Sequence, residues 1–246
     1  MIDTIFQHRS IRNYKEDDIP KNILHQILEA GTRASTTGNM QVYSMIVNKD
    51  PEIKDKLWEA HFKQEMVKKA PVHITFCADF HRFNTWCRNR KAEPGYDNFL
   101  SFMTAAIDAL LASQNVVLEA EAHGLGACYL GTATYNADKI IEILNLPENV
   151  VPVAAIVLGY PAEVPDLTDR LPLEAVVHNE KYGIFDKEKI NRVYQEREAS
   201  DETRELLEIN QKETLAQIFT DNRYKKEDNE FFSAKYMDVL KQQGFI

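Results

Sequence analysis

A short basic segment near the N-terminus could bind an anion. It is His8-Arg9-Ser10-Ile11-Arg12, which places two guanidinium groups and a hydroxyl within five residues. A guanidinium is planar, and its forked donors match the oxygens of a phosphate. A solvated N-terminal arm explains the same residues, and by itself such a cluster is more often that. Arg170, far along the chain, could supply a second phosphate contact or simply be exposed.

A polar loop and a strand end could contact a flat heterocycle. The loop, Ser35-Thr36-Thr37-Gly38-Asn39-Met40-Gln41, carries three hydroxyls and two amides. Amides pair a donor with an acceptor and so suit the edge of a heterocycle, although an ordinary capped turn is the better explanation of the loop by itself. Tyr129-Leu130-Gly131-Thr132 ends a short predicted strand. Its glycine would let the backbone approach a ligand closely, and an ordinary turn explains it equally well.

The sequence lacks the motifs of several enzyme classes. It has no GxxxxGK[ST], HExxH or GxSxG, and Gly124-Leu125-Gly126 does not complete a GxGxxG fingerprint. The seven histidines are scattered with no pair at i, i+4, and the three cysteines form no CxxC pair. We therefore expect no metal site, no catalytic triad and no P-loop. Cys77 and Cys128 fit small core residues better than nucleophiles.

Composition narrows the possible partners. The chain has 246 residues, with 29 Lys and Arg against 38 Asp and Glu, a net charge of −9. An acidic chain of this kind is not expected to bind nucleic acid or an anionic membrane surface. The N-terminus has no apolar signal core, and the longest apolar stretch, residues 150–159, is about half of the roughly 20 residues that span a membrane. We expect a cytoplasmic protein.

The pattern of elements predicts an α+β fold. The expected strands are residues 42–48, 72–78, 127–130 and 150–159, and the main expected helices are 20–31, 51–69, 99–123 and 137–146. Residues 99–123 are apolar around much of the helix circumference, which predicts a central buried helix. After Tyr160 the chain becomes proline-rich and then highly charged. We expect a domain over residues 1–180 and a helical extension over 181–246 that packs on a partner surface.

Six segments together resemble the nitroreductase superfamily of FMN-dependent oxidoreductases, and most closely its oxygen-insensitive nitroreductases and NADPH–flavin oxidoreductases. In order, they are HRSIRNY, STTGNMQ, FCADF, GLGACYLG, LGYPAEVPDLTDRLP and VVHNEKY, and the resemblance covers residues 4–185. It implies a nitroreductase-like fold, with a mostly antiparallel sheet flanked by helices around the long buried helix. It also implies a homodimer with FMN at the subunit interface, which the C-terminal extension would embrace.

The resemblance assigns flavin contacts to four parts of the chain. His8, Arg9, Ser10 and Arg12 match contacts to the ribityl phosphate and the flavin edge, and Arg170 matches a distal phosphate-binding arginine. Ser35, Thr36 and Thr37 match hydroxyls that contact flavin in the dimer, and Asn39 and Gln41 lie in the same loop. Gln64 matches a glutamine near the pyrimidine side of the ring. Tyr129, Leu130, Gly131 and Thr132 match the backbone under the isoalloxazine.

Two positions depart from the group. Thr168 stands where these enzymes usually have a lysine near flavin N1 and O2, and Thr132 replaces the second glycine of the strand-end pair. Without the cation, the reduced, anionic flavin would be less stabilised, so its potential would be lower. No residue can be assigned to an NADPH 2′-phosphate. A preference for NADPH over NADH therefore rests on the family resemblance alone.

The implied reaction needs no catalytic side chain. Flavin N5 would take a hydride from NAD(P)H and pass it, in ping-pong order, to a nitroaromatic, a quinone or a similar electron-poor acceptor. Two alternatives stay open: a flavin reductase that supplies free reduced FMN, and a flavin-binding redox protein without turnover.

Overall fold

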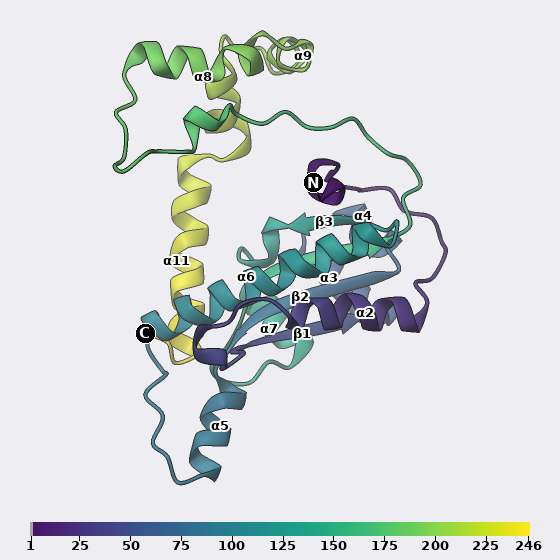
Figure 1. Cartoon of the computed structure of the whole chain (residues 1–246), viewed down its shortest axis with the longest axis vertical. Coiled ribbons are helices and arrows are strands. Elements are labelled where there is room, and N and C mark those ends of the chain that lie inside the picture. The colour runs from purple at the N-terminus through teal and green to yellow at the C-terminus, as the bar shows by residue number, and fades with distance from the viewer. Residues whose placement is uncertain (1) are drawn as a thin grey trace. The chain divides into compact units, whose positions relative to one another are not determined.

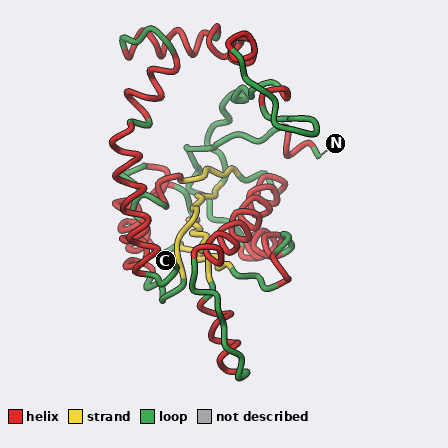
Figure 2. The backbone as a smooth tube through the Cα atoms, turned by 90° about the vertical axis from the view of Figure 1, so that its left-hand side faces the viewer, coloured by secondary structure: helices red, strands yellow, loops and turns green. Residues whose placement is uncertain are grey.

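The computed structural model describes residues 2–246, and its centre is one four-stranded sheet. The strands are β1 (Tyr43–Asn48), β2 (Val72–Asp79), β3 (Gly126–Leu130) and β4 (Val150–Gly159). Their order is β1-β2-β4-β3, and every neighbouring pair is antiparallel (Figure 1; yellow in Figure 2). Each strand begins and ends within one residue of its predicted range. The β-branched and apolar runs were sufficient to locate all four.

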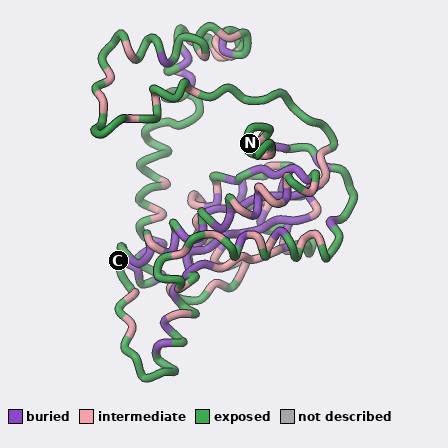
Figure 3. Tube along the Cα trace, in the orientation of Figure 1, coloured by how far each residue is buried: buried purple, intermediate pink, exposed green. Residues whose placement is uncertain are grey.

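Helices cover both faces of this sheet. On one face lie α2 (Lys21–Thr32) and α6 (Phe99–Ala122), with Ile74 of β2 and Leu158 of β4 in the buried cluster between them. On the other face lie α3 (Pro51–Ala60), α4 (Glu65–Lys69) and α7 (Ala137–Leu144), packed around Val157. The buried residues follow the sheet and the sides of the helices that face it (Figure 3). The predicted α+β arrangement, an antiparallel sheet flanked by helices, is confirmed.

Helix α6 buries one side and exposes the other. Its sheet-facing side carries small residues, among them Ala109 and Ala112, which are fully buried and allow close packing. Asn98 caps its first turn, accepting a hydrogen bond from the backbone nitrogen of Ser101 at 3.0 Å. The helix is long and apolar enough to cross a membrane, but 56% of that window is buried within the protein, as in the core helix of a soluble protein. The prediction of a buried helix is therefore correct for the side of α6 that faces the sheet, and not for its opposite side.

The region predicted as one helix over residues 51–69 is two helices. Phe62 and Lys63 have φ values of 54° and 58°, in the left-handed region, so an α-helix cannot continue through them. Helix α3 therefore ends at Ala60 and α4 begins at Glu65. The break leaves His61 completely buried. An amphipathic pattern with no glycine or proline gave no signal for this break.

Four further helical elements of the sheet-containing part are short. They are α1 (Asp3–Phe6), α5 (His81–Asn89) and the 3-10 turns η1 (Thr37–Asn39) and η2 (Gly131–Ala133). In Figure 1, α5 projects away from the sheet. Tyr96, in the loop after α5, returns to stack on Phe80 with a ring separation of 5.0 Å. The aromatic stretch after Phe80 is thus a short helix followed by a loop.

The chain divides into two compact units. The first comprises the residues up to Asp166 together with Phe232–Ile246, and the second is Leu167–Phe231. The second contains η3 (Leu173–Ala175), α8 (Lys187–Ala199), α9 (Asp201–Asn210), α10 (Leu215–Gln217), the π-helical turn η4 (Ile218–Arg223) and the start of α11 (Lys226–Gln242). The boundary expected after residue 180 falls inside this second unit. The end of the chain belongs to the first unit, where Val239, Leu240 and Phe245 are buried.

Candidate functional site

The N-terminal basic segment is fixed to the edge strand β3. Ser10 forms a parallel bridge with Ala127, and the backbone nitrogen of Ile11 donates to the Ala127 oxygen at 2.9 Å. Ile11 is buried against Gly126, where an added Cβ would lie 2.4 Å from Ile11 Cγ1. Only glycine allows this approach. The segment is therefore docked, not a free arm, and its side chains lie beside the strand-end motif.

The two arginines of this segment keep unused donors. Arg9 donates to Gln7 Oε1 at 3.0 Å, but its Nε is buried and has no hydrogen-bond partner in the described part of the chain. Arg12 is exposed, and no carboxylate in residues 2–246 pairs with it. Burial raises the pKa of Cys128, and the Arg12 charge and a hydrogen bond from Ser10 oppose that rise, so both lie near this thiol. Two uncompensated guanidiniums and a hydroxyl suit a phosphate.

His8 differs from the other members of the segment because it already has a partner. Its Nδ1 lies 2.6 Å from Oε1 of Glu121, near the end of α6. Burial raises the pKa of Glu121, and the hydrogen bond to His8 partly opposes this. In this structure His8 therefore ties the N-terminal segment to α6.

The polar loop of residues 35–41 is anchored on α6. Asp108, buried in that helix, accepts from the backbone nitrogen of Thr37 at 3.0 Å and from its hydroxyl at 3.4 Å. Gly38 and Asn39 both have φ values of 56°, which allow the loop to turn tightly onto the helix. Ser35 is exposed, whereas the Thr36 hydroxyl is buried with no hydrogen-bond partner among residues 2–246. Thr36 is therefore an unsatisfied polar group in this loop.

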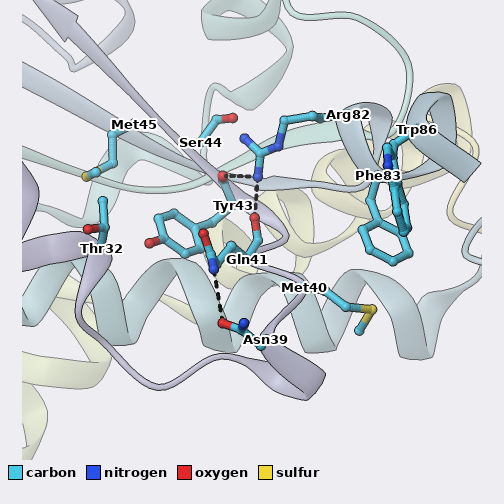
Figure 4. Close-up of a pocket in the computed structure, with 10 residues that line it drawn as sticks. All are labelled: Thr32, Asn39, Met40, Gln41, Tyr43, Ser44, Met45, Arg82, Phe83 and Trp86. Atoms are coloured by element: carbon cyan, nitrogen blue, oxygen red, sulfur yellow. Dashed lines mark hydrogen bonds between the residues drawn. The ribbon is translucent and has the colours of Figure 1, made fainter.

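Asn39 and Gln41 line a hollow of about 650 Å³ (Figure 4). They bond to each other, Gln41 Nε2 donating to Asn39 Oδ1 at 3.0 Å. The Arg82 guanidinium, which the sequence analysis missed, donates to the backbone oxygens of Gln41 and Tyr43. Trp86 also lines the hollow and is exposed. In the sequence, the only indication of Arg82 and Trp86 was that they lie in the charged, aromatic stretch after Phe80.

The strand-end motif brings together residues far apart in sequence. The Tyr129 hydroxyl lies 2.8 Å from Ser113 Oγ, and Leu130 is buried in the core. A Cβ added to Gly131 would meet no atom of the described residues within 4 Å, so space beside the strand end is open. Thr132 Oγ1 accepts from Gln64 Nε2 at 3.2 Å. A flat ring could approach the backbone here.

A buried histidine pair, which the sequence did not predict, lies behind Thr132. His61 Nδ1 is 2.8 Å from Thr132 Oγ1, and His61 Nε2 is 3.2 Å from His73 Nε2. Burial lowers the pKa of His61 to about 4 and holds that of His73 well below its usual value. Both imidazoles are therefore neutral at pH 7. Because the two histidines are twelve residues apart, no local sequence pattern indicated that they would pair.

Thr168 and Arg170 lie in the second unit. Arg170 is exposed, and its Nη1 donates to the backbone oxygens of Thr168 and Asp169 at 3.2 and 2.9 Å. Both residues line a hollow of about 650 Å³ within that unit, together with Arg197 and Arg223. The other predicted residues belong to the first unit.

Metal-binding and nucleophilic groups are not gathered anywhere in residues 2–246. No three His, Cys, Asp or Glu side chains in that range are placed to hold a metal ion. The three cysteines are buried and unpaired. Burial raises the pKa of both Cys77 and Cys128, which keeps these thiols protonated.

Comparison with known proteins gives a consistent result. The model of the nitroreductase family matches residues 5–160. FMN reductase (NADPH) of Bacillus subtilis is 34% identical over 185 residues, 74% of either chain. Oxygen-insensitive NADPH nitroreductase of Salmonella typhimurium is 32% identical over 191 residues, 78% of either chain. Among solved structures, a Bacteroides fragilis protein is 51% identical with a TM-score of 0.98 over 99% of both chains. NfrA1 nitroreductase from B. subtilis is 30% identical with a TM-score of 0.88, over 99% of this chain and 98% of its own.

Proposed function

Because the chain belongs to the nitroreductase family, we propose that it holds FMN and is an NAD(P)H-dependent flavin oxidoreductase. The observation that carries this is the docking of the Arg9–Arg12 segment beside β3. It puts uncompensated guanidinium groups next to a strand whose end, at Gly131, is open. A phosphate and a flat ring on one ligand fit these two features. FMN has both.

The residues present fit this cofactor. Arg9, Ser10 and Arg12 would bind its phosphate and edge, Thr36 and Thr37 its ring, and the backbone at Gly131 and Thr132 would lie under the ring. The buried, unpartnered Arg9 Nε and Thr36 Oγ1 are polar atoms that such a ligand would satisfy. When bound, FMN supplies two-electron hydride exchange at its N5 atom. The chain's own residues bind and orient the flavin and leave one of its faces open.

The acceptors we propose are flat and electron-poor, such as nitroaromatics and quinones, which react in ping-pong order. The same open face would admit NAD(P)H first and the acceptor afterwards. A second candidate is a flavin reductase that releases reduced FMN, and relatives named FMN reductase favour it.

We also propose that the enzyme is a homodimer with FMN at the interface. One side of α6 exposes a row of apolar side chains, Leu100, Met103, Ile107, Leu110 and Leu111. Between them, Asp108 holds the loop of residues 35–41. A second subunit covering this row would therefore lie against that loop, and the second unit would embrace it.

Changing the middle of the row tests the dimer. Ile107→Arg would place a charge in the interface and should give a monomer with little bound FMN. The matched control, Ile107→Val, should stay dimeric. Mass measured by light scattering after gel filtration distinguishes them, and a dimeric, flavin-loaded Ile107→Arg protein would contradict this interface.

We place the enzyme in the cytoplasm. Its three free thiols are buried and unpaired, and chains with free thiols are typical of a reducing compartment. The acidic net charge of −9 gives no attraction to nucleic acid or anionic membranes.

Anaerobic stopped-flow reduction with NADPH and NADH in parallel tests the function. We expect yellow protein that either donor bleaches, and parallel double-reciprocal plots with nitrofurazone or a quinone. Faster turnover with free FMN would favour the flavin reductase. Yellow protein that neither donor bleaches would be a flavin-binding protein without turnover, and colourless protein that takes up no FMN would contradict every form of the proposal.

A further inference from the structure

A line of polar groups runs from the middle of the sheet to the strand end, and the proposed function does not use it. It begins at His73 on β2, continues through His61 after α3, and ends at Thr132 in η2. Both histidines are completely buried, with ring centres 5.3 Å apart. Buried polar groups in an apolar core cost free energy unless they are paired. The presence of this line of polar groups in the core therefore points to a functional role.

The surroundings keep both rings neutral. Besides the two histidines themselves, the nearby charged group is Lys54 on α3, which is buried and donates to the backbone oxygens of Lys68 and Ala70. Its charge adds to the effect of burial in disfavouring protonation of His73. Each imidazole therefore carries one hydrogen, on either Nδ1 or Nε2.

The contacts decide which nitrogen carries each hydrogen. Only one hydrogen can lie between the two Nε2 atoms. If His61 supplied it, His73 would carry its own hydrogen on Nδ1, which is buried without a partner in residues 2–246. An unpaired buried N–H is rarer than an unused acceptor. His73 Nε2 therefore donates to His61, and His61 donates from Nδ1 to Thr132 Oγ1.

This arrangement fixes what Thr132 can do. Its oxygen accepts from His61 Nδ1 and also from Gln64 Nε2, whose assignment is secure because the same nitrogen donates to the His61 backbone oxygen at 3.1 Å. A hydroxyl accepts at most two hydrogen bonds. The Thr132 hydrogen must therefore be donated elsewhere.

We propose that His73 and His61 are positioning residues that fix the Thr132 hydroxyl as a hydrogen-bond donor to the bound flavin. This rests on the proposed FMN site. The physical effect is preorganisation: the hydroxyl cannot turn back to donate to His61, so it faces its ligand without rearrangement. Without the His73 donor, His61 could shift its hydrogen to Nε2 and take up the Thr132 hydrogen instead.

The hydrogen positions can be measured directly and do not depend on activity. Long-range proton–nitrogen NMR of ¹⁵N-histidine-labelled protein reports which ring nitrogen is protonated, and His61→Gln and His73→Gln samples assign the signals. We expect His61 protonated at Nδ1 and His73 at Nε2. His61 protonated at Nε2 would overturn the proposal even if the protein proved to bind no flavin.

The flavin potential tests the effect on the ligand. Thr132→Val should change the ratio of affinities for reduced and oxidised flavin about tenfold, equivalent to about 30 mV for a two-electron couple. His73→Phe should shift it in the same direction by a similar factor, and the double variant should add nothing further. Thr132→Ser and His73→Gln, which keep a donor, should stay within about threefold of the original ratio.

Thr75→Val is the matched control, because Thr75 is fully buried on the same strand and takes no part in the line. It should leave the ratio unchanged. A Thr132→Val shift that His73→Phe fails to reproduce would overturn the positioning role. Absence of flavin from the unaltered protein would instead overturn the proposed function, while the NMR result would still judge the hydrogen-bond arrangement.

Discussion

The carboxylate of Asp108 lies 3.0 Å from the backbone nitrogen of Thr37, and 71 residues of chain separate the two. Asp108 is almost completely buried in the middle of α6, so this contact fixes the polar loop on the central helix. The loop's position thus depends on the same helix that carries the exposed apolar row. In the proposed dimer, formation of the interface and the geometry of the loop would therefore be linked through Asp108.

Removing this carboxylate should loosen the loop. Asp108→Ala deletes hydrogen bonds to a charged acceptor, which typically contribute about 1.5–3 kcal/mol, and should lower both the free energy of unfolding and the FMN affinity. Asp108→Asn keeps an acceptor and should lose less of each. Urea unfolding and fluorescence titration with FMN measure the two effects. Full FMN affinity in Asp108→Ala would mean that the loop does not contact the flavin.

Arg12→Ala should release FMN. The phosphate would lose a charge-assisted contact of about 1.5–3 kcal/mol, or about 10- to 150-fold in affinity. Arg90→Ala, an exposed arginine after α5, is the control and should bind normally. If Arg170 contacts the same phosphate, Arg12→Ala and Arg170→Ala should be non-additive in a double-mutant cycle. Unchanged affinity in Arg12→Ala would refute this phosphate site.

If Thr168 lies near flavin N1 and O2, as the family resemblance implies, Thr168→Lys should raise the flavin potential. A cation near the ring stabilises the reduced, anionic flavin more than the oxidised form, and on the order of 1 kcal/mol corresponds to about 20 mV for a two-electron couple. Thr168→Gln, of similar length without charge, is the control. Potentials measured against a reference dye decide the outcome, and equal shifts in both variants would exclude a charge effect.

Stability should fall as the pH is lowered from 7 to 5. The pKa of His61 is about 4 in the folded protein and 6.5 when unfolded, so the unfolded state gains protons first as the pH falls. Protonation of His61 in the unfolded state should by itself lower the free energy of unfolding by about 2 kcal/mol over this interval. His73 acts in the same direction. Urea unfolding of His61→Gln at both pH values should show a flatter dependence. His81→Gln, at an exposed histidine, should keep the original slope.

The local sequence pattern was sufficient to predict the main strands and helices. It was not sufficient to predict the break within the helical region of residues 51–69. The strands over residues 72–79 and 150–159 were predictable because sheets covered on both faces need continuous apolar runs. The break after Ala60 was not, because Phe62 and Lys63 are ordinary helix residues that adopt left-handed φ values here. No local sequence pattern indicates that change of conformation.

The sequence by itself determined the α+β class, the positions of the strands and the residues able to bind an anion and a flat ring. These depend on composition and short spacing, which act locally. Only the tertiary structure decided which of these residues meet: Thr37 with Asp108, and Gln64 and His61 with Thr132. Such contacts join segments about 70 residues apart, and burial, with the Lys54 charge adding to it at His73, keeps the two histidines neutral.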